Sequence, residues 1–271
     1  MKKLEFYRQY NLGRMVFTEK GKPYFFEVTL SPYALDNPEL LHRILAVFKS
    51  YGTNVLTLRV SAPSRGEEVR VLVSADLSAA ESLVKSIVRD LESVEGVVEV
   101  RYAPPLLNGV AVDAWSHPLV FAGARAVILD EHFFKSLLME GFGKLGDGFG
   151  GVLFYIFYMT GRGMFEEWVG KLARRVEDQV ALFAEVFRLH GWGVLDFRGF
   201  FGNEAVFHVY DGLEANILRG SDVEAEFATR GLIAGFMSGV WGLPYGKVAV
   251  RETRCIRRGD PFCEIRVERK A

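Results

Sequence analysis

The order of strand-like and helix-like patterns in the first hundred residues is the feature that most limits the fold. Four short stretches are rich in apolar and β-branched residues or alternate them with polar ones, which is typical of strands. They are residues 25–30, 54–60, 69–73 and 97–100. Between them, two stretches repeat apolar residues three or four apart. One is entered at Pro38 and ends at Gly52, and the other begins near Ser78. The order β-α-β-β-α-β is the split βαβ unit of ferredoxin-like folds.

The chain is long enough for two domains. Its 271 residues lie near the upper limit of a single hydrophobic core. The segment Ala103-Pro104-Pro105 follows the last strand pattern and carries no periodicity, and its prolines favour an extended chain. We therefore expect one domain at residues 1–105 and a second domain at residues 106–271.

The first strand–helix loop of this unit reads Asp36-Asn37-Pro38-Glu39-Leu40-Leu41. It resembles the loop of ACT domains, which usually reads Asp-x-Pro-Gly-Leu-Leu. The resemblance implies a regulatory module that pairs into a homodimer, with an effector loop containing Asp36, Asn37 and Glu39. Glu39 stands where the family has glycine, a residue that lets backbone approach a ligand closely. Amino-acid binding and a purely dimerising role therefore both stay open.

The second half predicts helices first and then strands mixed with one further helix. The helical patterns cover 133–145, 165–187 and 227–240, and the strand patterns cover 194–201 and 205–210. The order of elements in both halves predicts an α+β fold class.

Three local patterns in this half need interpretation. Gly146-Asp-Gly-Phe-Gly-Gly151 matches the spacing of a dinucleotide-binding loop, but a helical pattern precedes it where a strand is required, so we interpret it as a helix–helix junction. Val152–Met159 is apolar on every side, which predicts a helix that is buried all round or lines a cavity. Ser221-x-x-Glu224 is a capping box that would open the helix after it.

Both cysteines of the chain lie near the C-terminus, in a stretch that predicts a β-hairpin. Glu252, Cys255 and Cys263 flank the turn residues Gly259-Asp260-Pro261. Thiolates bind zinc tightly, and a carboxylate can complete the site. In a regular strand Glu252 and Cys255 would face opposite sides, so the chain must bend near Arg254 for both to meet one ion. The alternative is a pair of reduced cysteines across a hairpin.

The full pattern is Val248-x-Val250-x-Glu252-x-x-Cys255-x-x-x-Gly259-Asp260-x-x-Cys263-x-Ile265. It resembles the signature of the 4-vinyl reductase domain, in its archaeal stand-alone type, and Gly231–Ser238 resembles the glycine-bearing helix of that family. The resemblance covers about residues 110–270 and implies an antiparallel sheet with long helices. It also implies a structural zinc ion held by Glu252, Cys255 and Cys263. The family's fourth ligand, a cysteine, corresponds to Glu226 here.

The family fold is similar to that of trafficking-complex subunits that hold an acyl chain, so the resemblance implies a small hydrophobic or aromatic ligand. The candidate pocket walls are Phe154, Phe157, Tyr158, Trp192 and Phe207. We expect a ligand-responsive regulatory or sensor protein, and we assign no catalytic residue. Two alternatives stay open: a reductase acting on a vinyl-bearing aromatic or tetrapyrrole-like substrate, and a structural assembly subunit with an acyl-filled tunnel.

The charge balance and the hydropathy of the chain limit the kinds of partner that the protein can have. Lys and Arg number 33 against 34 Asp and Glu, a net charge of -1, which is not the basic balance of a nucleic-acid binder. The longest apolar run is too short for a membrane span, and no apolar segment follows Met1-Lys2-Lys3 as in a signal peptide. We therefore expect a cytoplasmic protein without direct nucleic-acid contact, whose regulatory output passes through a protein partner.

Overall fold

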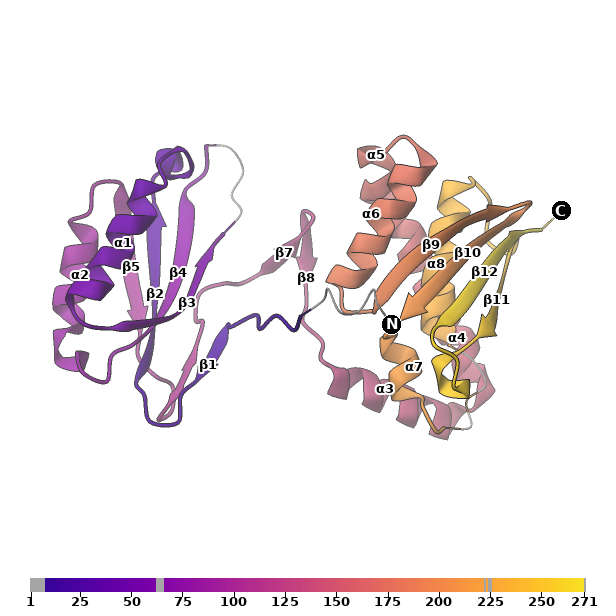
Figure 1. The fold of residues 1–271 in the computed structure, drawn as a ribbon, viewed down its shortest axis with the longest axis horizontal. Helices are drawn as coiled ribbons and strands as arrows, with labels where there is room; N and C mark the ends of the chain where they lie inside the picture. The colour runs from indigo at the N-terminus through magenta and orange to yellow at the C-terminus, as the bar shows by residue number, and fades with distance from the viewer. Residues whose placement is uncertain (1–7, 62–65, 222, 224–225, 271) are drawn as a thin grey trace. The chain divides into compact units, whose positions relative to one another are not determined.

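The computed structural model describes residues 8–61, 66–221, 223 and 226–270. The chain separates into two compact units, one spanning Gln9–Leu119 and a larger one containing Val120–Ala271 (Figure 1). Both units combine helices with antiparallel sheets, so the predicted α+β class is confirmed.

The first unit is a four-stranded sheet in the order β3-β4-β2-β5, with every neighbouring pair antiparallel. Its elements are β1 (Met15–Phe17), β2 (Pro23–Leu30), η2 (Pro32–Asp36), α1 (Glu39–Ser50), β3 (Asn54–Val60), β4 (Val69–Asp76), η3 (Glu81–Leu83), α2 (Val84–Glu92), β5 (Val97–Ala103) and β6 (Val110–Val112). This is the predicted β-α-β-β-α-β order. The second helix begins later than predicted, because the residues after Ser78 form turns and the short 3-10 helix η3.

All eight residues of the central strand β2 are buried. Phe26 and Val28 pack into the core under the apolar faces of α1 and α2, while Phe25 packs with Leu72 on the opposite face of the sheet. On that opposite face, β6 pairs antiparallel with β1 and places Ala111 against Phe25. The unit therefore continues to Leu119, past the predicted boundary after residue 105.

The second unit has a four-stranded antiparallel sheet in the order β11-β12-β10-β9, covered by helices on one face (Figure 1). Its elements are β7 (Leu119–Phe121), β8 (Ala124–Ala126), α3 (Glu131–Leu145), α4 (Asp147–Met164), η4 (Phe165–Val169), α5 (Gly170–Leu172), α6 (Val176–Leu189), β9 (Val194–Phe201), β10 (Glu204–Tyr210), α7 (Leu213–Ile217), α8 (Phe227–Val240), β11 (Val248–Arg254), η5 (Ile256–Arg258) and β12 (Cys263–Arg269). The core lies between the sheet and helices α6 and α8, where Phe183 stacks on Phe236 at 3.9 Å between ring centroids.

The predicted single helix over residues 165–187 is wrong. Helix α4 runs on into the π-helical turn η4 and ends after α5, and α6 begins separately at Val176. Ala173 is extended between them. The sequence does carry a signal for the new start, because Glu177 and Asp178 lie in the first turn of α6, where the helix dipole favours negative charge.

Of the two alternatives given for Val152–Met159, burial on every side is wrong. Only Leu153 and Tyr158 of this stretch of α4 are buried, and its outer face exposes 56% of Val152 and 53% of Ile156. The glycine-rich segment before it is confirmed as a helix–helix junction, because α3 ends at Leu145 and α4 begins two residues later.

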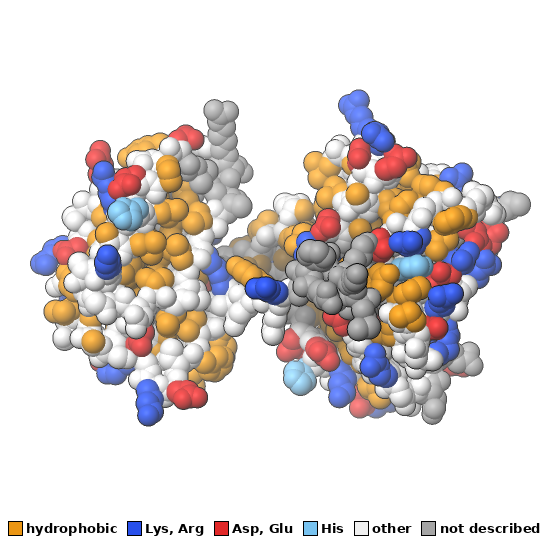
Figure 2. All heavy atoms as spheres, in the orientation of Figure 1, with side chains coloured by type: hydrophobic (Ala, Val, Ile, Leu, Met, Phe, Trp, Pro, Cys, Tyr) orange, Lys and Arg blue, Asp and Glu red, His pale blue; other side chains and the backbone are white. Residues whose placement is uncertain are grey.

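The surface of the protein mixes charges of both signs. Lys and Arg side chains are interspersed with Asp and Glu on the face shown in Figure 2. None of the helices in the described part of the chain has both the length and the apolarity needed to cross a lipid bilayer.

Helices α4 and α8 touch backbone to backbone through glycines on both helices. A Cβ atom on Gly235 would overlap the carbonyl of Tyr158, one on Gly231 would overlap the carbonyl of Phe154, and one on Gly161 would overlap the carbonyl of Leu232. Because these obstacles are backbone atoms, a side chain at any of the three positions forces the helices apart.

We predict that Gly235→Ala lowers the free energy of unfolding by about 3 kcal/mol or more, in the range of severe overpacking. The matched control is Gly163→Ala in α4, where a Cβ meets nothing within 4 Å. This control should leave stability unchanged or raise it by about 0.5–1 kcal/mol, because alanine favours helix. Urea denaturation of both variants measures the difference, and equal stability of the two would contradict the close packing.

Candidate functional site

Four buried acidic and thiol side chains converge at the base of α8. Glu226 is the N-cap of α8, Glu252 lies in β11, Cys255 follows that strand, and Cys263 opens β12. Their candidate ligand atoms all lie within 4.8 Å of one another. Glu226, Cys255 and Cys263 are fully buried, and the Glu252 side chain is 2% exposed.

A β-bulge brings Glu252 and Cys255 to the same side of the hairpin. Glu252 pairs with Ile265, and the next paired residue, Arg254, pairs with Glu264, so the register shifts by one residue between them. An extra residue in one strand bends it and re-aims the side chains that follow. This is the bend near Arg254 that convergence of the site required.

Hydrogen bonds within the turn help to position Cys255 and Cys263. The backbone N–H of Cys255 donates to Asp260 Oδ2 at 2.9 Å, and Gly259 has the left-handed φ of +90° that the turn requires. The N–H of Ile256 donates to Cys263 Sγ at 3.4 Å. The N–H of Ile256 stabilises negative charge on the Cys263 sulfur and orients it, as the outer shell of a metal site does.

Two of the interatomic distances in the cluster are close to those expected between ligands of one tetrahedral zinc ion. With Zn–S at about 2.3 Å and Zn–O at about 2.1 Å, two sulfur ligands lie about 3.8 Å apart, and a sulfur and an oxygen lie about 3.6 Å apart. Here the two sulfur atoms are separated by 3.6 Å, and Cys255 Sγ lies 3.7 Å from Glu226 Oε1. Both cysteines are free thiols.

Three of the four carboxylate oxygens of the site accept no hydrogen bond from the described residues. Glu226 Oε2 and both oxygens of Glu252 are buried and accept no hydrogen bond from the described residues. Burial, which disfavours the charged form, raises the pKa of Glu252 to about 9 and that of Glu226 to about 7. The hydrogen bond from Cys263 lowers the pKa of Cys255 to about 4 and raises that of Cys263. Without a metal the four groups must share protons, and a bound cation would displace those protons.

Two arginines supply positive charge beside the cluster. Arg257 Nε donates to Cys255 Sγ at 3.3 Å, and its Nη2 lies 3.9 Å from Glu252 Oε2. Arg230 donates from Nε to the carbonyl of Glu226 at 2.5 Å. Two carboxylates and two thiolates carry four negative charges. A divalent cation and two guanidiniums would balance them, so the residues fit a divalent metal.

Glu214 is a site residue that sequence reasoning missed. Its carboxylate is 1% exposed and accepts the N–H groups of Phe227, Ala228 and Thr229 at 2.7, 3.0 and 2.8 Å. These are first-turn donors of α8 that no other residue of the helix can satisfy. Burial raises the pKa of Glu214, and the three N–H donors oppose that shift.

Glu214, thirteen positions before Phe227, therefore caps the first turn of α8. The capping box predicted at Ser221 and Glu224 cannot be compared with it, because Glu224 lies outside the described residues. The short helix α7, which carries Glu214, was not predicted either, and the only local signal for a turn before it is the Asp211-Gly212 pair.

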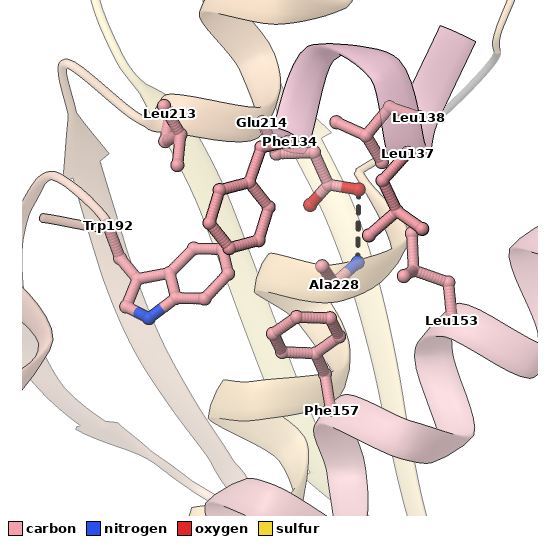
Figure 3. Close-up of a pocket in the computed structure, with 9 residues that line it drawn as sticks. All are labelled: Phe134, Leu137, Leu138, Leu153, Phe157, Trp192, Leu213, Glu214 and Ala228. Atoms are coloured by element: carbon pink, nitrogen blue, oxygen red, sulfur yellow. Dashed lines mark hydrogen bonds between the residues drawn. The ribbon is translucent and has the colours of Figure 1, made fainter. Parts of the chain in front are cut away.

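Two pockets adjoin α8, and Phe157 and Trp192 line both. The smaller holds about 10 Å³, enough for one water molecule, and Glu214 reaches it among apolar side chains (Figure 3). The larger, of about 550 Å³, lies beside the β7–β8 hairpin. Its apolar lining includes Met164, Trp168 and Leu232, and its polar lining includes Arg125, Thr160, Glu167 and His190.

The predicted pocket residues divide among three places. Phe157 and Trp192 meet at 5.0 Å between ring centroids and line the two pockets beside α8. Phe154 and Tyr158 line a separate pocket with Tyr245 and Arg230. Phe207 is fully buried in the core between the sheet and the helices.

The ACT-like loop lies in the first unit. Asp36 ends η2, Asn37 follows it, and both are exposed. The Glu39 carboxylate is 3.2 Å from the ring of His42 within α1.

No protein-family model matches the sequence, and no curated protein does. Among solved structures, the phenol-responsive sensory domain of the transcription activator PoxR, with phenol, aligns at 15% identity and a TM-score of 0.48, over 59% of this chain and 80% of that chain. A vinyl-4-reductase family protein from Methanocaldococcus jannaschii aligns at 15% identity and a TM-score of 0.37, over 54% and 85%. A trafficking protein particle complex subunit 3 from Naegleria fowleri, covalently bound to palmitic acid, aligns at 17% and 0.35, over 52% and 97%. All three TM-scores lie below 0.5, so the assignment of the site depends on the residues of this chain and not on these structures.

Proposed function

We propose that the second unit is a ligand-sensing domain stabilised by a structural zinc ion. Glu226, Glu252, Cys255 and Cys263 hold the zinc, and a small hydrophobic or aromatic molecule binds in the pocket beside the β7–β8 hairpin. The observation that carries the metal assignment is a closed cluster of two carboxylates and two thiols, in which three of the four carboxylate oxygens accept no hydrogen bond from the described residues.

Zinc suits the donor set better than the other common cations do. Magnesium and calcium take hard oxygen ligands, whereas paired thiolates select zinc among redox-inert metals. Four protein ligands fill a tetrahedral shell and leave no open position for substrate, which is the pattern of a structural site. The ion would tie the hairpin turn to the start of α8.

We predict about one zinc ion per purified chain and a loss of thermal stability on chelation, because a structural site contributes folding free energy. Glu252→Gln should lower zinc affinity at least tenfold, as removal of a direct ligand does. The control is Glu185→Gln, a side chain 57% exposed on α6. Metal analysis and chelator titration measure both, and less than about 0.2 zinc per chain in the unaltered protein would refute the site.

The pocket beside the hairpin has the size and lining of a small-molecule site. Its volume of about 550 Å³ lies within the range of about 300–1,000 Å³ usual for ligand pockets. Aromatic rings form much of the wall, with a few polar groups between them. His190 lines the pocket, and its Nδ1 is 2.8 Å from the carbonyl of Val186, so this contact does not occupy Nε2.

We predict that toluene and phenol, used as probes, bind this pocket and that Thr160→Trp weakens them at least tenfold by filling it. The control is Tyr155→Trp on the exposed face of the same helix, which does not line this pocket. Ligand-observed NMR gives the affinities, and native mass spectrometry identifies any co-purified molecule. Equal binding by the two variants would place the ligand elsewhere and leave the zinc assignment intact.

We assign the predicted homodimer to the edge strand β3. It lies at the end of its sheet, and Leu58 and Val60 are 40% and 43% exposed, which leaves an apolar edge that can pair with a second copy. Leu58→Lys should convert the dimer to a monomer in light scattering. The control Leu83→Lys, at a leucine 43% exposed on η3, should remain dimeric. A monomeric unaltered protein would reject the assignment.

A further inference from the structure

The first unit contains a pocket that the proposed zinc and ligand sites do not involve. It has a volume of about 180 Å³. Its polar walls come from segments far apart in sequence: Arg14 before β1, Glu27 on β2, Arg59 on β3 and Arg70 on β4. Glu27 and Arg70 belong to the sheet face that α1 and α2 leave open, because they follow the register of Phe25 and Leu72.

Most of the charges around this pocket are already paired. Arg14 donates from Nε to Asp113 at 2.9 Å and from Nη2 to the carbonyl of Ser116 at 2.7 Å, which holds its guanidinium in place. The Glu27 side chain is 6% exposed. It lies between Arg70 at 3.5 Å and Arg101 at 3.9 Å, so its negative charge is offset on both sides.

Arg59 differs from these arginines. No carboxylate among the described residues lies within ion-pair distance of it. Its guanidinium packs against Gly13, where a Cβ atom would overlap Arg59 Nη2. Gly13 also has a left-handed φ of +57°, and its N–H is bonded to the Asn11 side chain at 2.7 Å. The absence of a side chain at Gly13 therefore leaves room for Arg59 at the pocket wall, and the left-handed φ favours glycine at that position.

The formal charge at the pocket is positive. Arg14, Arg59, Arg70 and Arg101 carry four positive charges. Glu27, Asp113 and Glu99, which binds Arg101 at 2.8 Å, carry three negative charges. One positive charge remains, and three guanidinium groups line the space itself. Guanidinium groups present planar forks of N–H donors that match the oxygens of phosphate, sulfate or carboxylate.

We propose that this pocket binds the oxyanion group of a small ligand, with Arg59 as the principal donor and Arg14 and Arg70 beside it. A dianionic phosphate group gains more from this surplus charge than a carboxylate does. The apolar side chains of Leu72 and Leu119 line the same pocket and offer contact to the uncharged part of such a ligand.

The test uses the full chain with inorganic phosphate, sulfate and acetate as probes in isothermal titration calorimetry. We expect saturable phosphate binding with a dissociation constant of about 1 mM or tighter, weaker binding of acetate, and weakening of both with added salt. Arg59→Gln should weaken phosphate binding at least about tenfold, the cost of one charge-assisted contact. Arg59→Lys should recover part of the loss, because it keeps the charge without the fork.

The control is Arg89→Gln, an arginine of the same unit that is 76% exposed and does not line the pocket. It should bind phosphate as the unaltered chain does, and circular dichroism should show that all variants are folded. Absence of saturable phosphate binding in the unaltered protein overturns the proposal. So does equal affinity of the Arg59→Gln and Arg89→Gln variants. Zinc content should not change in either variant, so this test is independent of the metal site.

Discussion

The contact between the backbones of α4 and α8 determines where the rest of the second unit can lie. Because Gly161, Gly231 and Gly235 carry no side chains, α8 lies close enough to α4 for backbone atoms of the two helices to be in contact. The axis of α8 is thereby fixed over the sheet, with Phe236 stacked on Phe183 of α6. Its first residues then fall beside the β11–β12 turn, which is where Glu226 joins the cysteines.

The start of α8 combines two opposing electrostatic demands. The helix begins with unpaired N–H groups, and the Glu214 carboxylate satisfies three of them from outside the helix. The same position carries Glu226, which is buried with Glu252 and two thiols, and all four groups become negatively charged when they lose their protons. Burial of so much negative charge is unfavourable unless cations balance it. The two nearby arginines supply part of that balance, and a divalent metal would supply the remainder.

The local patterns of the sequence predicted where helices and strands form. They predicted less well which face of each element is buried and which distant residues it contacts. The strand over residues 54–60 and the hairpin around Gly259 were predicted because short alternating stretches and turn residues act locally. Glu226 was named only through a family resemblance, since nothing in its own neighbourhood indicates a ligand. Glu214 was missed because it caps a helix across a loop. Arg59 reads as an ordinary surface charge until the topology of the sheet places it beside Arg14 and Arg70.

The helix contact also constrains how this sequence can change during evolution. Any substitution of a glycine codon that alters the amino acid introduces a residue with a Cβ atom or ends the chain. At Gly161, Gly231 and Gly235 each such step places an atom where the neighbouring backbone already lies. A lineage cannot reach a different residue there through a neutral intermediate unless both helices shift together. The exposed side of α4, which carries Val152 and Ile156, has no such restriction, so it should accumulate substitutions much faster than these glycines do.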